Sequence, residues 1–304
     1  MSELRRLRYF LTVADERNFT RAAERLHIAQ SALSRQVRLL EQELGVELLH
    51  RTTHDVELTD AGRFLVERGP ALLGSADDLW RAAREFGAGE RGTVCVAYGT
   101  SAGYETAPQL LGGVRARLPG VTITTRVAAL GEIVRGIADG TVDAGIARCP
   151  TPADGIAVHV VRNEAQGVLL RADHALATDQ LALADLRDET LLLHARDANP
   201  GHYDAVLGLC AAAGFTPRLA LRELSFDLAQ TPVAAGDAVA IVGESTRGGL
   251  PPGLTWIGLT PPATFEIALL VRDGARRPVV DRLVAVAADA ARELGWVDGH
   301  AAAS

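Results

Sequence analysis

Apolar residues recur three and four positions apart through most of the first ninety residues, the spacing of one face of a helix. A first amphipathic helix is predicted by four such residues: Leu4, Leu7, Leu11 and Ala14. We expect it to end near Asn18, and Thr20 to cap a short second helix. A third, longer helix is predicted by a buried stripe of four residues: Leu33, Val37, Leu40 and Leu44. The pattern predicts three packed helices at the start of the chain.

The third helix also has a polar side. Opposite its apolar stripe lie five residues that can donate hydrogen bonds: Gln30, Ser31, Ser34, Arg35 and Arg38. A short helix, a tight turn and a longer helix with an arginine-bearing leading face are typical of a helix-turn-helix, whose second helix enters the DNA major groove. The alternative is that these arginines only solvate an exposed helix face, and the surrounding pattern disfavours it.

The chemistry of the groove assigns a role to each residue type. Arg35 can donate two hydrogen bonds to O6 and N7 of guanine, and Gln30 can pair in a similar way with adenine. Ser31, Ser34 and Thr20 are short donors suited to phosphate oxygens, which set the register of the protein on DNA without reading its sequence.

A wing is predicted after the third helix, because residues 48–58 lose the helical period and place a polar tip between two apolar pairs. Arg51, Thr53 and His54 at this tip are assigned to DNA contact, with Arg51 reaching a phosphate or the minor groove.

A long helix is predicted from Thr59 onward. Four apolar residues recur along it every seven positions, a spacing that favours pairing with a second helix: Leu65, Leu72, Leu79 and Phe86. The alternative partner for this seam is the chain's own N-terminal domain. Pro70 lies inside the helix, where it lacks the backbone N–H group, so we expect a kink.

Beyond a glycine-rich joint at residues 87–92, the pattern changes to short apolar runs that alternate with helical windows. This alternation predicts α/β units with largely parallel sheets, and a repeated helix-to-strand turn suggests two lobes. The strand candidates are residues 93–98, 121–127, 142–147, 167–170, 191–193, 238–242 and 267–271.

Composition limits the class of protein. The 304 residues include 48% hydrophobic and 23% charged residues, ordinary globular values. Three cysteines without CxxC spacing argue against a disulfide framework or a zinc cluster, and neither an export signal nor a membrane-spanning run is found. We therefore expect a cytoplasmic protein without membrane contact.

The formal net charge of −7 argues at first against a nucleic-acid partner. Its distribution changes this conclusion, because residues 1–92 hold 14 arginines and 15 acids, whereas residues 93–304 hold 17 and 23. Residues 17–40 carry five arginines against Glu24 alone. This modest basic segment predicts that DNA affinity depends on several copies acting together.

The ordered positions of the N-terminal part resemble the winged-helix domain of LysR-type transcriptional regulators over roughly sixty residues. The resemblance is carried by Ala22-Ala23-Glu24-Arg25-Leu26, by 29–37, by Leu40-Glu41 and Leu44-Gly45, by Arg51 and by Leu58-Thr59-Asp60-Ala61-Gly62. It continues more weakly over nearly the whole chain. The sequence departs from the family at Ala29, where serine is usual, at Leu49-His50, and at His54, which is often arginine.

The resemblance implies an N-terminal all-α winged helix-turn-helix with a long linker helix, followed by a C-terminal α/β domain of two lobes similar to type 2 periplasmic-binding proteins. It implies that the linker helix dimerises and that dimers pair into tetramers. Family DNA contacts match Gln30, Ser31, Ser34, Arg35 and Arg51. The expected division is 1–59 for DNA binding, 60–86 for the linker helix, 87–92 for a hinge and 93–304 for effector binding. Lobe I covers about 93–164 and 268–304, and lobe II about 165–267.

Gly99-Thr100-Ser101-Ala102-Gly103 matches the G-x-S-x-G motif, in which Ser101 would be the nucleophile of a serine hydrolase. That fold places several strands before the motif, whereas here helices precede it. The second interpretation assigns Thr100 and Ser101 to an effector site, because hydroxyl and N–H groups at the start of a helix attract a carboxylate. The resemblance agrees, since matching positions line the cleft between the lobes.

Three further residues are effector-site candidates. Arg148 is expected on a loop, where it either neutralises an anionic effector or is simply exposed to solvent. His202 and Phe226 are assigned on weaker grounds. A redox sensor based on Cys149 and Cys210 is the other alternative, and burial of Cys210 in an apolar helical run is the better account.

The sequence predicts a cytoplasmic, homo-oligomeric transcription regulator, without catalytic, cofactor or metal site, that binds double-stranded DNA under control of a small anionic effector, expected to be a carboxylate. RNA polymerase is a further expected partner. The competing functions are the hydrolase and a constitutive DNA-binding protein that ignores every metabolite.

Overall fold

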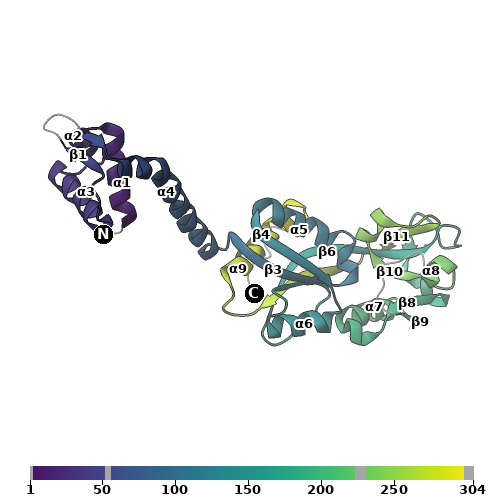
Figure 1. Ribbon diagram of the computed structural model, residues 1–304. Helices are drawn as coiled ribbons and strands as arrows, with labels where there is room; N and C mark the ends of the chain where they lie inside the picture. Colours follow the sequence, from purple (N-terminus) through teal and green to yellow (C-terminus); the bar gives the residue numbers. More distant parts are fainter. Residues whose placement is uncertain (1–2, 52–55, 223–230, 298–304) are drawn as a thin grey trace. The chain divides into compact units, whose positions relative to one another are not determined.

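The computed structural model describes residues 3–51, 56–222 and 231–297. The chain divides into two compact units, Met1–Arg84 and Glu85–Ser304. The boundary falls inside one long helix, α4 (Asp60–Gly87), which is labelled in Figure 1.

The N-terminal unit is built on three helices: α1 (Glu3–Glu16), α2 (Phe19–Arg25) and α3 (Gln30–Leu44). The predicted stripe of α3 is buried at Leu33, Val37 and Leu40, while Leu44 is exposed. Ala22 and Ala23 are buried between α2 and its neighbours, because only small side chains allow such close packing. The helix-turn-helix predicted from periodicity is confirmed.

The cap of α2 differs from the prediction. Asn18, not Thr20, is the N-cap residue, and its Oδ1 accepts hydrogen bonds from the backbone N–H groups of Thr20 (2.8 Å) and Arg21 (3.1 Å). Asparagine is among the best N-cap residues, because its short side chain reaches the unpaired N–H groups of the first turn. The hydroxyl of Thr20 is therefore not used as a cap.

The wing consists of two antiparallel strands, β1 (Leu49–Arg51) and β2 (Val56–Leu58), with Leu49 opposite Leu58. After it, α4 runs without interruption through Pro70. Gly69 lies against Leu7 and Leu11 of α1, where a Cβ atom would have little room. The kink expected at Pro70 stays a prediction.

The C-terminal unit contains a mixed sheet, not the largely parallel one expected. Its strand order is β4-β3-β5-β12-β6-β11-β7, with β10 also paired to β6. β3 pairs in parallel with β4 and β5, whereas β6 and β12 run antiparallel to all their neighbours. The strands are β3 (Arg91–Tyr98), β4 (Gly120–Val127), β5 (Ala144–Arg148), β6 (Ile156–Arg171), β7 (Leu181–Ala182), β10 (Ala240–Gly243), β11 (Leu254–Thr260) and β12 (Thr264–Arg272).

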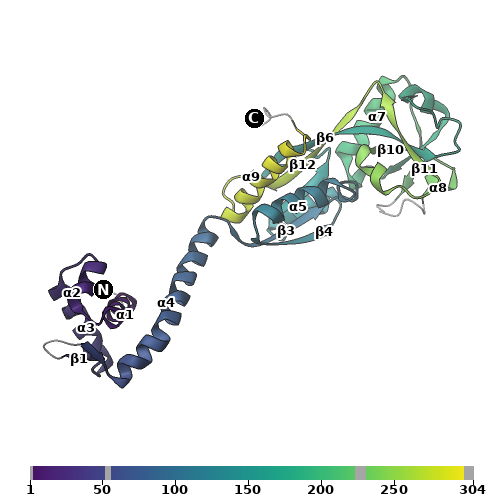
Figure 2. The same cartoon turned by 90° about the horizontal axis from the view of Figure 1, so that it is seen from above.

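Two lobes share the long strand β6. Its first part pairs with β12, and its last part pairs with β10 and β11, so the chain passes from one lobe to the other along a single strand (Figure 2). Helices cover both faces of the first lobe's sheet, with α5 (Thr106–Arg117) and α9 (Pro278–Glu293) on one side and α6 (Leu130–Asp139) on the other.

The second lobe has its own apolar core around Leu170, Leu181 and Val206. It adds a parallel pair of strands, β8 (Thr190–His194) and β9 (Arg218–Arg222), and the helices α7 (Pro200–Ala212) and α8 (Pro232–Ala235). Short 3₁₀ turns complete the unit: η1 (Thr100–Gly103), η2 (Leu183–Asp188), η3 (Arg196–Ala198) and η5 (Glu244–Gly249). The fold is an N-terminal helical domain with a wing and a C-terminal α/β domain of two lobes.

Among the residues that the structure describes, no helix has the length and apolar content needed to cross a membrane. In the same residues, no group of three histidine, cysteine or acidic side chains is arranged to hold a metal ion.

Candidate functional site

The polar face of α3 presents the groove-reading candidates. Gln30, Ser31, Arg35 and Arg38 are exposed, and Ser34 is half-buried. The guanidinium of Arg35 forms no hydrogen bond or ion pair with any described residue, whereas Arg38 Nη2 donates to Ser34 Oγ at 3.4 Å. The side chain of Arg35 is thus unengaged by the described protein and available to a base edge.

The first turn of α3 adds anion-binding groups. Ala29 is the N-cap residue and forms no side-chain cap, so the first N–H groups of the helix lack that partner. Exposed N–H groups at the start of a helix bind phosphate oxygens. Thr20 is exposed in α2.

Part of the basic charge of residues 17–40 is neutralised. Arg25 Nη1 lies 2.5 Å from Asp15 Oδ2 and 3.1 Å from Glu16 Oε1, and Arg21 Nε lies 3.7 Å from Glu16 Oε2. These acids lie just before the basic segment in the sequence. Among the described residues, the arginines of this segment without an ion pair are Arg35 and Arg38 on α3 and Arg17 between α1 and α2.

The wing candidates are described only in part. Arg51 is the last residue of β1, and nothing is described of its side chain. Thr53 and His54 lie outside the described residues. Their assignment to DNA contact stays a prediction.

The heptad residues of α4 separate into two groups. Leu65 packs against the N-terminal core, whereas Leu72, Leu79 and Phe86 are 55%, 62% and 56% exposed. Phe64 and Trp80, which the heptad pattern did not include, are also exposed. Large apolar side chains in this number on one helix indicate an interaction surface.

A cavity in the C-terminal unit collects four of the five effector candidates. Thr100 and Ser101 come from η1, Arg148 from the end of β5, and His202 from α7. They are separated by up to about a hundred residues in the chain and meet only in the folded unit. Phe226 lies outside the described residues.

The cavity is also lined by residues that were not predicted from the sequence. Most are apolar or small side chains from strands and helix starts, with three polar exceptions in the second lobe, His194, Asn199 and Thr246. The apolar part includes Tyr104, Leu130, Ile133, Leu192, Leu193, Ile241 and Val242. A mostly apolar cavity with a few polar groups is the usual form of a small-molecule site.

The hydroxyl groups of Thr100 and Ser101 are half-buried at the cavity and form no hydrogen bond to any described residue. Ser101 forms no hydrogen bond with a histidine in the described chain, so the nucleophile and base contact of a serine hydrolase is not formed there.

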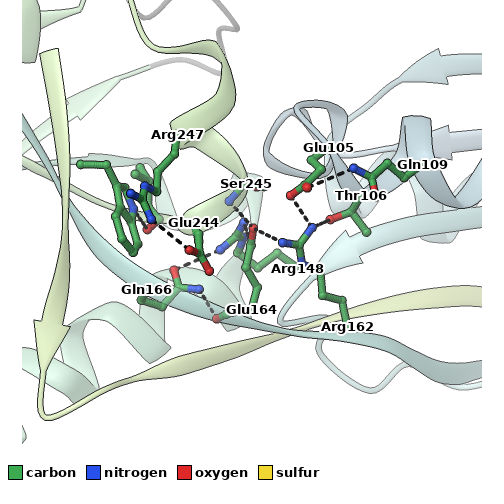
Figure 3. A network of polar contacts seen from close by, with 12 residues as sticks. Glu105, Thr106, Gln109, Arg148, Arg162, Glu164, Gln166, Glu244, Ser245 and Arg247 are labelled. Atoms are coloured by element: carbon green, nitrogen blue, oxygen red, sulfur yellow. Dashed lines mark hydrogen bonds and ion pairs between the residues drawn. The ribbon is translucent and has the colours of Figure 1, made fainter. Parts of the chain in front are cut away.

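The expectation that Arg148 is a solvent-exposed loop residue is wrong. It is the last residue of a strand and only 3% exposed, and its guanidinium pairs with the fully buried carboxylate of Glu164 (Figure 3). Its Nη1 also donates to Gln166 Oε1 at 3.0 Å, and Glu164 Oε1 accepts from the N–H group of Ser245 at 2.9 Å. The positive charge of Arg148 is therefore matched inside the protein.

The same polar network extends away from the cavity. Arg162 Nη1 donates to Glu105 Oε2 (2.8 Å) and Thr106 Oγ1 (3.2 Å), as Figure 3 shows. Its guanidinium also lies 4.6 Å from the ring centre of Trp296. β6 contributes both Arg162 and Glu164, so this strand carries charge into the junction of the lobes.

Two histidines contact each other beside the cavity. His194 Nε2 lies 2.8 Å from His202 Nδ1, and His202 packs edge-on against Phe265. Burial holds the pKa of His202 well below its ordinary value, and Arg148 and His194 lower it further. His202 is thus an uncharged, buried member of the site.

The cysteines are poor candidates for peroxide sensing. Burial raises the pKa of Cys149 to about 11 and also raises the pKa of Cys210, which is buried as expected. The thiolate is the reactive form, so a raised pKa suppresses the oxidation chemistry of both groups at neutral pH.

Comparison with known proteins identifies the family. Residues 4–63 match the family model "Bacterial regulatory helix-turn-helix protein, lysR family", and residues 87–292 match "LysR substrate binding domain". The chain belongs to the LysR family of transcriptional regulators. Both the fold and the family resemblance expected from the sequence are confirmed, and the regulator is a DNA-binding protein with an effector-binding domain.

Individual relatives cover most of the regulator. The probable cat1 operon transcriptional activator of Acinetobacter lwoffii is 32% identical over 247 residues, which is 81% of this chain and 82% of that protein. The regulator BenM of Acinetobacter baylyi is 30% identical over 275 residues, or 89% and 90%. These relatives are transcriptional regulators, so the hydrolase alternative is excluded and the regulator is not an enzyme.

Solved structures agree. The crystal structure of CbnR, a LysR family transcriptional regulator, matches with a TM-score of 0.84 at 30% identity and covers 94% of this chain and 100% of CbnR. Full-length CbnR complexed with its target DNA matches with a TM-score of 0.78 at 29% identity, over 96% and 100%.

Proposed function

We propose that a small carboxylate binds in the cavity between the two lobes and controls how the regulator holds its winged helices on specific DNA. The observation that carries this proposal is the convergence of Thr100, Ser101, Arg148 and His202 from distant segments on one mostly apolar cavity. A ligand that contacts both lobes favours one arrangement of them, and only such differential affinity can shift the regulator between two states.

The carboxylate is assigned to the end of the cavity formed by η1. The hydroxyls of Thr100 and Ser101 supply donors that no described residue uses. Arg148 is the one permanently charged side chain among the described lining residues, and its pairing with Glu164 limits what it offers an anion. Neutral donors therefore carry most of the recognition in this proposal.

DNA recognition is assigned to α3 and the wing. Arg35 and Gln30 set base preference, whereas Ser31, Ser34, Arg38 and Arg51 set affinity and register through phosphates, with Thr20, Thr53 and His54 at the edge of the same surface. The exposed arginine and glutamine on α3 support this assignment.

Oligomerisation is assigned to α4. Leu72, Leu79 and Phe86 are exposed apolar residues at seven-residue spacing, and a second copy of α4 would cover them, as a dimer or within a tetramer. Leu65, the first residue of this seven-residue repeat, already packs against the core of its own domain. Two copies place two recognition helices on successive half-sites.

The proposal includes a cytoplasmic location, because the target DNA lies there, and contact with RNA polymerase. The second point draws on the relative whose name describes a transcriptional activator. The working division of the chain into 1–59, 60–86, 87–92 and 93–304 belongs to the same proposal.

The test uses the full-length regulator and the DNA upstream of its own gene. A thermal-shift screen of carboxylated metabolites should find a compound that stabilises the regulator, and the same compound should change its affinity for that DNA. The Thr100→Val and Ser101→Ala variants should lose the response while retaining DNA binding. A regulator that binds DNA but responds to no anion would support the constitutive alternative.

A further inference from the structure

The two histidines beside the cavity form a hydrogen-bond chain whose direction can be worked out. His194 Nδ1 lies 3.0 Å from the carbonyl oxygen of Ala195, which can only accept a hydrogen bond. The hydrogen of His194 is therefore assigned to Nδ1. Because a neutral imidazole has one N–H group, a neutral His194 has a lone pair at Nε2, and the donor of the 2.8 Å contact is then His202 Nδ1.

This assignment leaves Nε2 of His202 as a lone pair. No described residue donates a hydrogen bond to that atom, and it is not among the fully enclosed unpartnered atoms of the described chain. His202 itself lines the cavity, so Nε2 is the one polar ring atom that it can still offer a ligand. The site has a hydrogen-bond acceptor at this position.

The groups around His202 keep its imidazole uncharged, which maintains the direction of the hydrogen bonds between the two histidines. Arg148 approaches from β5, His194 from β8 and the apolar ring of Phe265 from β12, while the carboxylate of Glu164 on β6 is engaged by Arg148. Burial opposes a proton on His202 most strongly, and the cation of Arg148 and the imidazole of His194 oppose it further.

We propose that the effector presents a hydrogen-bond donor, a hydroxyl or amide N–H group, to Nε2 of His202. This inference rests on the proposed effector site and narrows its ligand class. A carboxylate at Thr100 and Ser101 and a donor at His202 define a small hydroxylated or amide-bearing carboxylic acid, with an apolar body against Leu130, Ile133 and Ile241.

Selectivity follows from the acceptor. The parent acid, which lacks the hydroxyl group, leaves the lone pair of His202 Nε2 buried without a hydrogen-bond donor. In the O-methyl analogue an ether oxygen faces Nε2, and because both atoms are acceptors they form no hydrogen bond. Each change is expected to weaken binding at least about fivefold.

The experiment measures binding of matched compounds to the full-length regulator by titration calorimetry. The probes are benzoate, the three hydroxybenzoates and the corresponding methoxybenzoates, with 3-methylbutanoate and its hydroxylated form as an aliphatic set. Phenol and benzyl alcohol serve as probes without a carboxylate. At least one hydroxylated acid should bind about fivefold or more tightly than both its parent and its O-methyl form.

Variants connect the preference to His202. His202→Phe cannot accept a hydrogen bond and should reduce the ratio between the affinities for the hydroxylated and the parent acid to about one. His202→Gln keeps an acceptor and should retain part of the preference. His159→Phe is the matched control, because His159 is a half-buried histidine of the same unit that does not line the cavity.

The outcomes separate this inference from the proposed function. Carboxylates that bind with no preference for a hydroxyl, or with a preference that survives in His202→Phe, overturn the inference and leave the effector site standing. Binding of phenol or benzyl alcohol that depends on His202, without binding of any acid, supports the acceptor and overturns the carboxylate. Absence of binding by every probe overturns the ligand class as a whole.

Discussion

The guanidinium of Arg35 is exposed on α3 and forms no hydrogen bond or ion pair with the described part of the chain. A bidentate contact with guanine would use this free group, and such a contact discriminates against a wrong base by about 1 to 3 kcal/mol. We therefore predict that Arg35→Ala weakens binding to the specific DNA site by this amount and changes binding to random DNA little. Competition gel shifts or fluorescence anisotropy measure both affinities.

The control is Arg25→Ala on α2, because Arg25 is already engaged by Asp15 and Glu16. It should leave the ratio of specific to random binding unchanged. Equal losses of both affinities in Arg35→Ala would assign Arg35 to phosphate contact instead.

Arg148 and Glu164 form a buried ion pair, and breaking it is expected to destabilise the regulator. The side chains are 2% and 0% exposed, so removing one charge leaves the other buried without compensation. We expect Glu164→Gln to lower the free energy of unfolding by roughly 3 to 5 kcal/mol. Glu244→Gln, which breaks the exposed pair with Arg247, should cost less than about 1 kcal/mol. Urea denaturation measures both, and similar losses would contradict the role of burial.

The lowered pKa of His202 makes stability depend on pH. The unfolded chain takes up a proton near the ordinary value of about 6.5, whereas the folded chain holds His202 neutral to lower pH, mainly through burial. The unfolded state thus binds more protons below about pH 6.5, and stability falls as pH falls through this range.

The corresponding measurement is the melting temperature at about pH 7.5 and 5.5. His202→Phe should lose less on acidification than the wild type, because it removes this one titrating group while the carboxylates remain. An identical loss in the two proteins would show that His202 does not contribute.

At the scale of elements, α4 presents large apolar side chains beyond the part that packs in its own domain. Leu79 is 62% exposed, and burying it in a helix pair would stabilise the oligomer by roughly 1.5 to 3 kcal/mol. We expect Leu79→Asp to shift the regulator toward monomers, measured by sedimentation velocity. Gly74→Asp introduces the same charge on the opposite face of the helix, at an exposed position with open space around it, and should leave the oligomer intact. Dissociation in both variants would point to charge and not to the seam.

Some strands of the C-terminal unit were predicted from the sequence and others were missed. The predicted segments 93–98, 121–127 and 267–271 fall inside β3, β4 and β12, because apolar β-branched runs signal buried strands. The first half of β6 was missed, since His159, Arg162 and Glu164 interrupt its apolar pattern. These charges are tolerated in the strand because partners from other elements pair with them, for example Glu105 with Arg162. Strands β7, β9 and β11 were also missed.

Each copy of the regulator offers few unpaired arginine side chains to DNA. Residues 1–92 carry 14 arginines and 15 acids, and several of these arginines pair internally. Salt dependence of DNA binding reports the number of phosphates neutralised by each complex. We expect Leu79→Asp, if monomeric, to show roughly half or less of the wild-type slope of log affinity against log salt. An unchanged slope would show that one copy makes all the contacts.

Sequence by itself determined the local parts of this regulator. The stripe at Leu33, Val37 and Leu40 is buried, and the alanines of α2 lie in the helix contact, because side chains three or four apart share a helix face wherever the helix is placed. The order of residues around this helix pair was also sufficient to indicate the family.

Only the tertiary structure decided the site. Nothing near Arg148 in the sequence shows that Glu164 cancels its charge, and nothing near His194 shows that it contacts His202. Thr100, Ser101 and His202 share one cavity because the two lobes bring their segments together. Periodicity reports only which face of an element is buried, whereas the partner of a buried polar group depends on contacts between elements far apart in the chain.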